Sequence, residues 1–134
     1  MKLIVGISGA TGAAYGVGLL RTLKTLEVET HLIMSRWGAE TLKTETGLTE
    51  QDIAATASCV YDNDDLAAPI SSGSFRTDGM IVLPCSMKTL AAIACGYDDS
   101  LMARAAGVML KERRRLVLCP RETPLSAIHL ENML

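Results

Sequence analysis

Small, hydroxylated and charged residues follow four apolar runs of this sequence, and their types could bind a ligand. They are Ser8-Gly9-Ala10-Thr11-Gly12, Ser35-Arg36, Ser86-Met87-Lys88-Thr89 and Arg121-Glu122. Hydroxyl groups, the free backbone N–H groups of a glycine-rich turn, and ammonium or guanidinium groups all bind phosphate. One polar turn would carry little weight, because turns are polar in general. Four of them predict a site for an anionic ligand if the fold brings them together.

The glycine-rich turn departs from the common nucleotide-binding fingerprints. If Gly9 and Gly12 are aligned with the last two glycines of G-x-G-x-x-G, Ile7 stands where the first is needed. Ser35-Arg36 stands where an acidic residue would bind a ribose hydroxyl. The pattern G-x-x-x-x-G-K-[ST] is absent. The sequence therefore disfavours NAD and nucleoside triphosphates and suits a mononucleotide such as FMN.

The elements that must position these turns alternate between strands and helices. Continuous apolar runs predict strands at 2–8, 29–35, 79–85 and 115–120. Helical spacing predicts helices at 13–26, 38–45, 49–57, 86–96 and 100–113, with a loop at 62–77. This alternation predicts an α/β fold, a Rossmann-like or flavodoxin-like doubly wound parallel sheet in three layers, as one domain over 1–134. Ligands of such sheets bind at the carboxyl ends of the strands, which is where all four turns fall.

Composition narrows the function classes. With 49% apolar and 21% charged residues, the chain has the balance of a soluble globular protein. A net charge of -2 and few aromatics argue against a nucleic-acid partner. The 4 cysteines form no CxxC pair, so we expect no metal site and a reducing, cytoplasmic location. The apolar N-terminal run has the length of a strand, so we expect no membrane association.

Four segments resemble the UbiX/Pad family of flavin prenyltransferases over the whole chain. They are GISGATGAAYG, PCSMKTLAAIACG, RAAGVMLKERRRLVL and PRETPLSAIHLENML. The last block is the most specific. The resemblance implies that FMN binds, that reduced FMN is alkylated at N5 by dimethylallyl monophosphate, and that a second bond closes at C6. The product serves a UbiD-type decarboxylase. Family members continue beyond the last residue here, so the resemblance implies that the C-terminal part of the family domain is absent.

The resemblance also implies roles for individual residues. Those expected to hold FMN are Gly9, Ala10, Thr11, Ser35, Ser86, Met87, Lys88, Thr89 and Arg121. Glu45, with Thr11, should manage protons near flavin N5, and Glu122 should transfer a proton during ring closure. Lys111 and Arg104 match residues that bind the prenyl phosphate, and Lys111 is also expected to be catalytic. The family implies a homo-oligomer, a dodecamer, with sites between subunits.

Simpler structural roles remain open for most of these residues. Ser35, Ser86 and Thr89 could cap helices, and Glu45 and Lys111 could be solvated surface charges. Arg104 could form an interface ion pair, and Arg121 could pair with Glu122. The small residues of helix 100–113, among them Ala103, Ala105 and Ala106, could permit close packing between subunits.

Two other functions also stay open. The chain could be a flavin-dependent decarboxylase that acts directly on an aromatic acid or a cysteinyl peptide. It could also be an FMN-binding protein or subunit without prenyl transfer.

Overall fold

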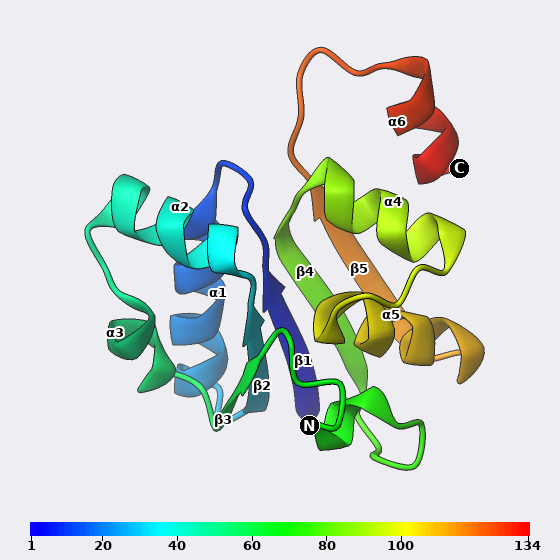
Figure 1. The fold of residues 1–134 in the computed structure, drawn as a ribbon. Coiled ribbons are helices and arrows are strands. Elements are labelled where there is room, and N and C mark those ends of the chain that lie inside the picture. The colour runs from blue at the N-terminus through cyan, green and yellow to red at the C-terminus, as the bar shows by residue number, and fades with distance from the viewer.

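The computed structural model describes all residues 1–134 and contains one five-stranded parallel sheet (Figure 1). The strands are β1 (Lys2–Ile7), β2 (Glu29–Met34), β3 (Cys59–Asp62), β4 (Gly79–Cys85) and β5 (Arg115–Pro120). The α-helices are α1 (Ala13–Thr25), α2 (Arg36–Thr46), α3 (Glu50–Ala54), α4 (Met87–Cys95), α5 (Leu101–Lys111) and α6 (Ala127–Met133). A 3-10 turn, η1, spans Pro69–Ser71. No helix is both long and apolar enough to cross a bilayer.

The strand order β3-β2-β1-β4-β5 places a topological switch point between β1 and β4. From β1 the chain builds outward through β2 to β3, then returns to the other side of β1 and builds outward through β4 to β5. The connections that leave β1 and β4 therefore diverge, α1 to one face of the sheet and α4 to the other (Figure 1). Divergence of this kind opens a crevice at the carboxyl ends of the two strands.

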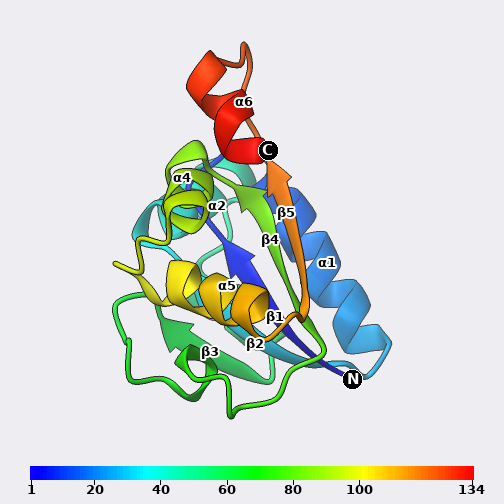
Figure 2. The same cartoon turned by 90° about the vertical axis from the view of Figure 1, so that its right-hand side faces the viewer.

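Each face of the sheet has its own core, because β1 and β2 are buried on both sides. Val5 and Leu32 point to the side of α1, α2 and α3, whereas Ile4 and Ile33 point to the side of α4, α5 and η1. The view in Figure 2 shows the sheet between these helix layers, with α6 beyond the end of β5, where it contacts α4. The α/β, three-layer prediction is confirmed, and the strand order is of the Rossmann type.

The predicted elements differ from the observed ones mainly between residues 49 and 62. The helix expected at 49–57 is only Glu50–Ala54, and a fifth strand, β3, follows it. This strand was not predicted, because it is four residues long and lies at the sheet edge, where Cys59 and Val60 stay exposed. The expected interface role is wrong for Ala103, Ala105 and Ala106, because all three are buried in the core of this chain. Gly107, the fourth small residue of that face, is half-buried, and for it the expectation stays a prediction.

Gly38 lets the start of α2 press against the end of β1. A Cβ added there would meet the carbonyl oxygen of Ile7 closer than real contacts allow. Because backbone cannot yield as a side chain can, we expect Gly38→Ala to lower the free energy of unfolding by about 1–3 kcal/mol. Gly18→Ala is the matched control, since nothing lies within 4 Å of its added Cβ. The control should stabilise α1 by up to about 1 kcal/mol. Urea unfolding of both variants checks this, and equal stabilities would contradict it.

Candidate active site

Ser8 fastens β1 to β4 where the crevice opens. Its hydroxyl donates to the Pro84 carbonyl at 2.8 Å and accepts from the Ser86 N–H at 2.7 Å. The side chain is 1% exposed, so it faces no ligand. Ser8 therefore sets the spacing of the two strand ends, and the residues that follow it form the ligand-facing surface.

The N-termini of α2 and α4 lie on the two sides of this crevice. The Ser35 hydroxyl caps α2 by accepting from the Gly38 N–H at 3.0 Å, and the Ser86 hydroxyl caps α4 by accepting from the Thr89 N–H at 3.2 Å. The capping roles considered for Ser35 and Ser86 are thus confirmed. The N–H groups of Arg36 and Met87, at the first position of each helix, have no acceptor in the chain. Helix N-termini with free N–H groups attract anions.

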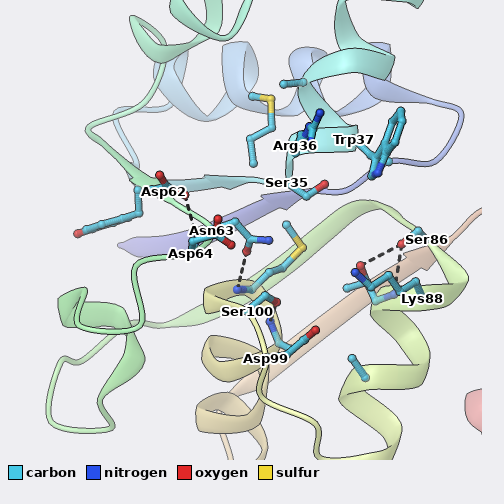
Figure 3. Close-up of a pocket in the computed structure, with 18 of the residues that line it drawn as sticks. Ser35, Arg36, Trp37, Asp62, Asn63, Asp64, Ser86, Lys88, Asp99 and Ser100 are labelled. Carbon is cyan, nitrogen blue, oxygen red and sulfur yellow. Dashed lines mark hydrogen bonds between the residues drawn. The ribbon is translucent and has the colours of Figure 1, made fainter.

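A cavity of about 800 Å³ extends from these helix ends toward β3. Figure 3 shows its walls. Ser35 and Trp37 stand on one side and Ser86 and Lys88 on a second, and Ser100, just before α5, lies across the cavity from Ser35. At the other end, the carboxylates of Asp62, Asp64 and Asp99 line it. Because like charges repel, a phosphate is favoured at the end near Lys88 and disfavoured near the aspartates.

Of the residues expected to hold FMN, Gly9, Ser35, Ser86, Lys88 and Thr89 line this cavity. The others do not line it. Ala10, Thr11 and Met87 are within two residues of a lining residue in the sequence, and Arg121 follows β5 at the same edge of the sheet. The structure thus brings the predicted strand-end turns to one edge.

Glu45 binds the start of α1 across the fold. Its carboxylate accepts from the Gly12 N–H at 3.1 Å and from the Ala13 N–H at 2.9 Å. Gly12 has a φ of 111° and no side chain that could cap the helix. Glu45 is therefore the N-cap that α1 lacks in its own sequence. The residue is exposed, as a surface charge would be, but its carboxylate is bonded to the backbone that follows Thr11.

Arg121 and Glu122 follow β5 at the same edge but do not pair with one another. The Arg121 N–H donates to the Cys85 carbonyl at 3.2 Å, which ties the turn to β4. The Glu122 carboxylate accepts from the Thr123 N–H at 3.1 Å. Both side chains are exposed and available to a ligand. The possible salt bridge between them is absent.

Neither Arg104 nor Lys111 lines the cavity. Their helix, α5, follows Ser100, which lines the cavity, and Lys111 at its last position is about 15 Å farther along the helix axis than Leu101. Figure 2 shows α5 lying along the sheet. Arg104 pairs with Asp98 at 3.2 Å, and Lys111 pairs with Glu112 at 2.7 Å. The ion pair considered for Arg104 exists, but within the chain. Within one chain, therefore, neither cation belongs to the lining of the candidate FMN site.

Two contributors to the site were missed in the sequence. Asn63 accepts from the Leu101 N–H through its carbonyl and from the Met102 N–H through its side chain, so it ties the end of β3 to the start of α5. Recognition of β3 would have pointed to Asn63 by the same strand-end rule. Trp37, the single tryptophan, is 68% exposed on the cavity wall.

Cys85 is excluded as a nucleophile. It is buried, and burial raises the pKa of its thiol to about 12, so the thiolate that attacks electrophiles is not formed.

Comparison with known proteins decides the family. The profile described as Flavoprotein matches residues 1–133. A probable UbiX-like flavin prenyltransferase of Streptomyces sp. (strain D7) is 61% identical over 100% of this chain and 68% of its own length. The chain belongs to the UbiX-like flavin prenyltransferase family.

Two solved structures of UbiX-like proteins extend the match to three dimensions. A dodecameric FMN-dependent UbiX-like decarboxylase from Escherichia coli O157:H7 is 62% identical, with a TM-score of 0.98 over 99% of this chain and 72% of that one. AnUbiX (PadA1), solved in complex with FMN and dimethylallyl pyrophosphate, is 58% identical, with a TM-score of 0.97 over 98% of this chain and 70% of that one. Membership of the UbiX-like family agrees with the crevice, because a cavity with anion-binding helix ends at one end fits a flavin mononucleotide in size and charge.

Proposed function

We propose that this chain is a flavin prenyltransferase that binds FMN and joins to it the dimethylallyl group of dimethylallyl monophosphate. The observation that carries the proposal is the switch-point cavity, where the N-termini of α2 and α4 and the Lys88 ammonium converge at one end. Reduced FMN supplies the nucleophilic N5 atom. The chain's own residues bind the two phosphates, hold the flavin and the prenyl group in position, and move protons.

The FMN phosphate is assigned to the end of the cavity near Lys88. Ser35 and Ser86 keep their capping bonds there, whereas Thr89 lies inside α4, is not a cap, and bonds the Ser86 hydroxyl through its own hydroxyl. The hydroxyl hydrogen of Ser35 remains free to donate. The turn from Gly9 to Thr11, the Met87 N–H and the Arg121 guanidinium are assigned to the same ligand. These assignments rest on the position of the groups at one sheet edge and on the chemistry of phosphate recognition.

Replacing Lys88 by glutamine should weaken FMN binding about 10-fold or more, because a hydrogen bond between charged groups is lost. The variant should fold normally, since Lys88 makes no contact within the chain that it would leave unpaired. Lys43→Gln, on the same kind of exposed helix surface but outside the cavity, is the matched control. Titration followed by FMN fluorescence measures both, and equal affinities would remove Lys88 from the phosphate site.

The prenyl phosphate is assigned to Arg104 and Lys111 of a second copy. Neither residue lines the cavity of its own chain, Lys111 stands at the far end of α5 from it, and a relative with a TM-score of 0.98 is a dodecamer. As the allylic C–O bond breaks, negative charge grows on the leaving phosphate. Fixed cations stabilise that charge more than they stabilise the ground state, which is the condition for catalysis.

Glu45 and Glu122 are assigned the proton transfers. The N-terminus of α1 holds the Glu45 carboxylate in place beside Thr11, so this acid is positioned before any ligand arrives. Glu122 stands on the turn that β5 delivers to the same edge, with an exposed carboxylate. Acids positioned in this way contribute about 10²–10⁴-fold to proton-transfer steps.

We further propose that the product is delivered to a UbiD-type decarboxylase, in a reducing cytoplasm that suits the free cysteines. The test is reconstitution. Flavin released from this protein after reaction with dimethylallyl monophosphate should activate an apo-decarboxylase, whereas unreacted FMN should not. Carbon dioxide release from an aromatic acid by this chain alone would instead favour the decarboxylase function, after which the Escherichia coli relative is named.

A further inference from the structure

The turn at 121–125, which carries Arg121 and Glu122 from β5 toward α6, is tied to the rest of the chain by hydrogen bonds only at its two ends. At the first end the Arg121 N–H donates to the Cys85 carbonyl at 3.2 Å, so the turn starts from the sheet. The one further bond is local, from the Thr123 N–H to the Glu122 carboxylate. All five residues of the turn are exposed. The position of the Glu122 carboxylate therefore depends on what fixes the far end.

His129 fixes the far end of the turn through a capping box. The Ser126 N–H donates to His129 Nδ1 at 3.1 Å, and the His129 N–H donates to the Ser126 hydroxyl at 3.2 Å. These reciprocal bonds close the first turn of α6 on the residue that follows the exposed segment. The usual side-chain acceptor of a capping box is Glu or Gln, and this chain has histidine in that place.

The box matters because α6 is short and exposed. The helix has 7 residues and none of them is buried, and so short a helix is marginal without its caps. Its half-buried residues, His129 and Asn132, are three apart and so share one face. Because α6 packs against α4, whose start lines the FMN cavity, the box ties the turn to an element of the site (Figure 1).

Only a neutral His129 can close the box. A backbone N–H donates to Nδ1, so this nitrogen holds a lone pair and the ring proton is on Nε2. A protonated ring carries hydrogen on both nitrogens and would set two donors against each other. Its positive charge would also lie at the positive end of the α6 dipole. Histidine is the side chain whose charge changes between about pH 5 and 8.

No other titratable group near the box holds the imidazole. Such groups on α6, on α4 and on the turn are Glu131, Lys88, Cys95, Arg121 and Glu122. None of them forms an ion pair or a hydrogen bond with His129. A change in the charge of the ring therefore acts directly on its bond with the Ser126 N–H.

We propose that His129 is a positioning residue: its neutral imidazole accepts the Ser126 N–H and so holds the turn that presents Glu122, and protonation of the ring releases this turn. The inference rests on the proposed function, which uses the acid and the guanidinium of the turn. It adds a residue outside the lining of the FMN cavity. Prenyl transfer should thus fall at acidic pH for a reason separate from the titration of the reacting acids.

The test compares two substitutions of His129. His129→Gln keeps an acceptor of the kind that capping boxes use, so the single-turnover rate of prenyl transfer at about pH 8 should stay within about twofold of the unaltered protein. His129→Ala removes the acceptor, and the rate should fall about 10-fold or more, because a misplaced catalytic group costs up to about 100-fold. Glu131→Gln, an exposed residue of the same helix, is the control.

The pH profile separates positioning by the neutral ring from a merely structural role. Between about pH 8 and 5 the rate of the unaltered protein should fall more steeply than that of His129→Gln, since only the unaltered protein loses the box. Glu45, Glu122 and the flavin titrate in both proteins, so their effect cancels in the ratio of the two rates. A constant ratio, or His129→Gln as slow as His129→Ala, would overturn the inference.

Cleavage by trypsin after Arg121 tests the anchor without any ligand. His129→Ala should be cut there faster than the unaltered protein, His129→Gln and Glu131→Gln, because its turn is released. Equal cleavage of all four, with circular dichroism showing each one folded, would contradict the anchoring role. If the cleavage order holds but the unaltered protein transfers no prenyl group, the proposed function fails and the anchor remains.

Discussion

Lys111→Gln is expected to slow prenyl transfer about 100-fold while leaving FMN affinity unchanged, since one fixed charge beside the leaving phosphate is worth about that much. Lys111 is exposed at the end of α5, and its partner Glu112 stays solvated when the lysine is lost. The fold should therefore survive. Lys43→Gln provides a control of equal charge change. Single-turnover rates with saturating FMN measure the effect. A rate within a few fold of the unaltered protein would contradict the role given to Lys111.

The same variant tests whether the site is shared between copies. If Lys111 acts on the cavity of a neighbour, oligomers reassembled from Lys111→Gln chains and Glu45→Gln chains will contain some sites with both residues intact. We expect the mixture to be more active than either variant alone. Activity no greater than the average of the two would mean that each chain uses its own Lys111, although Lys111 does not line the cavity of its own chain.

Glu45→Ala is expected to reduce both stability and activity. The change removes the only acceptor of the Gly12 and Ala13 N–H groups at the start of α1, and the loss of a helix cap costs about 0.5–2 kcal/mol. Prenyl transfer should fall about 100-fold or more with the loss of a positioned acid. Urea unfolding measures the first effect, and single-turnover rates measure the second.

Glu45→Gln separates the two roles of Glu45. The amide oxygen can still accept from the start of α1, so stability should be largely retained, but the group can no longer carry a proton. Glu27→Gln, an exposed acid at the opposite end of α1, is the control. If Glu45→Gln kept full activity, Glu45 would be a helix cap and nothing more.

The sheet and its ligand edge follow from the sequence because their signals are local. Apolar runs predict the buried strands, and polar residues at the strand ends place Ser35, Ser86 and Arg121 on one edge. The edge strand β3 is not marked by a long apolar run, because it is four residues long and mostly exposed. Since β3 was not predicted, Asn63 and the aspartates that line the cavity could not be placed from the sequence.

The separation of Lys111 from the cavity has a different cause. In a parallel α/β sheet a crossover helix starts at the carboxyl edge and returns toward the amino edge, so the far end of α5 was predictable from topology alone. Glu45 caps α1 from a position distant in the sequence, and Arg104 pairs with Asp98 across the turn before α5. Spacing rules do not specify such contacts.

The most direct test of the central claim is the mass of the flavin that this protein releases. The purified chain is incubated without oxygen with reduced FMN and dimethylallyl monophosphate, and the flavin is then separated and weighed by mass spectrometry. The account predicts a flavin heavier than FMN by one prenyl unit, formed only when both ligands and protein are present. Release of FMN with unchanged mass, from protein that binds it tightly, would contradict prenyl transfer and leave an FMN-binding protein.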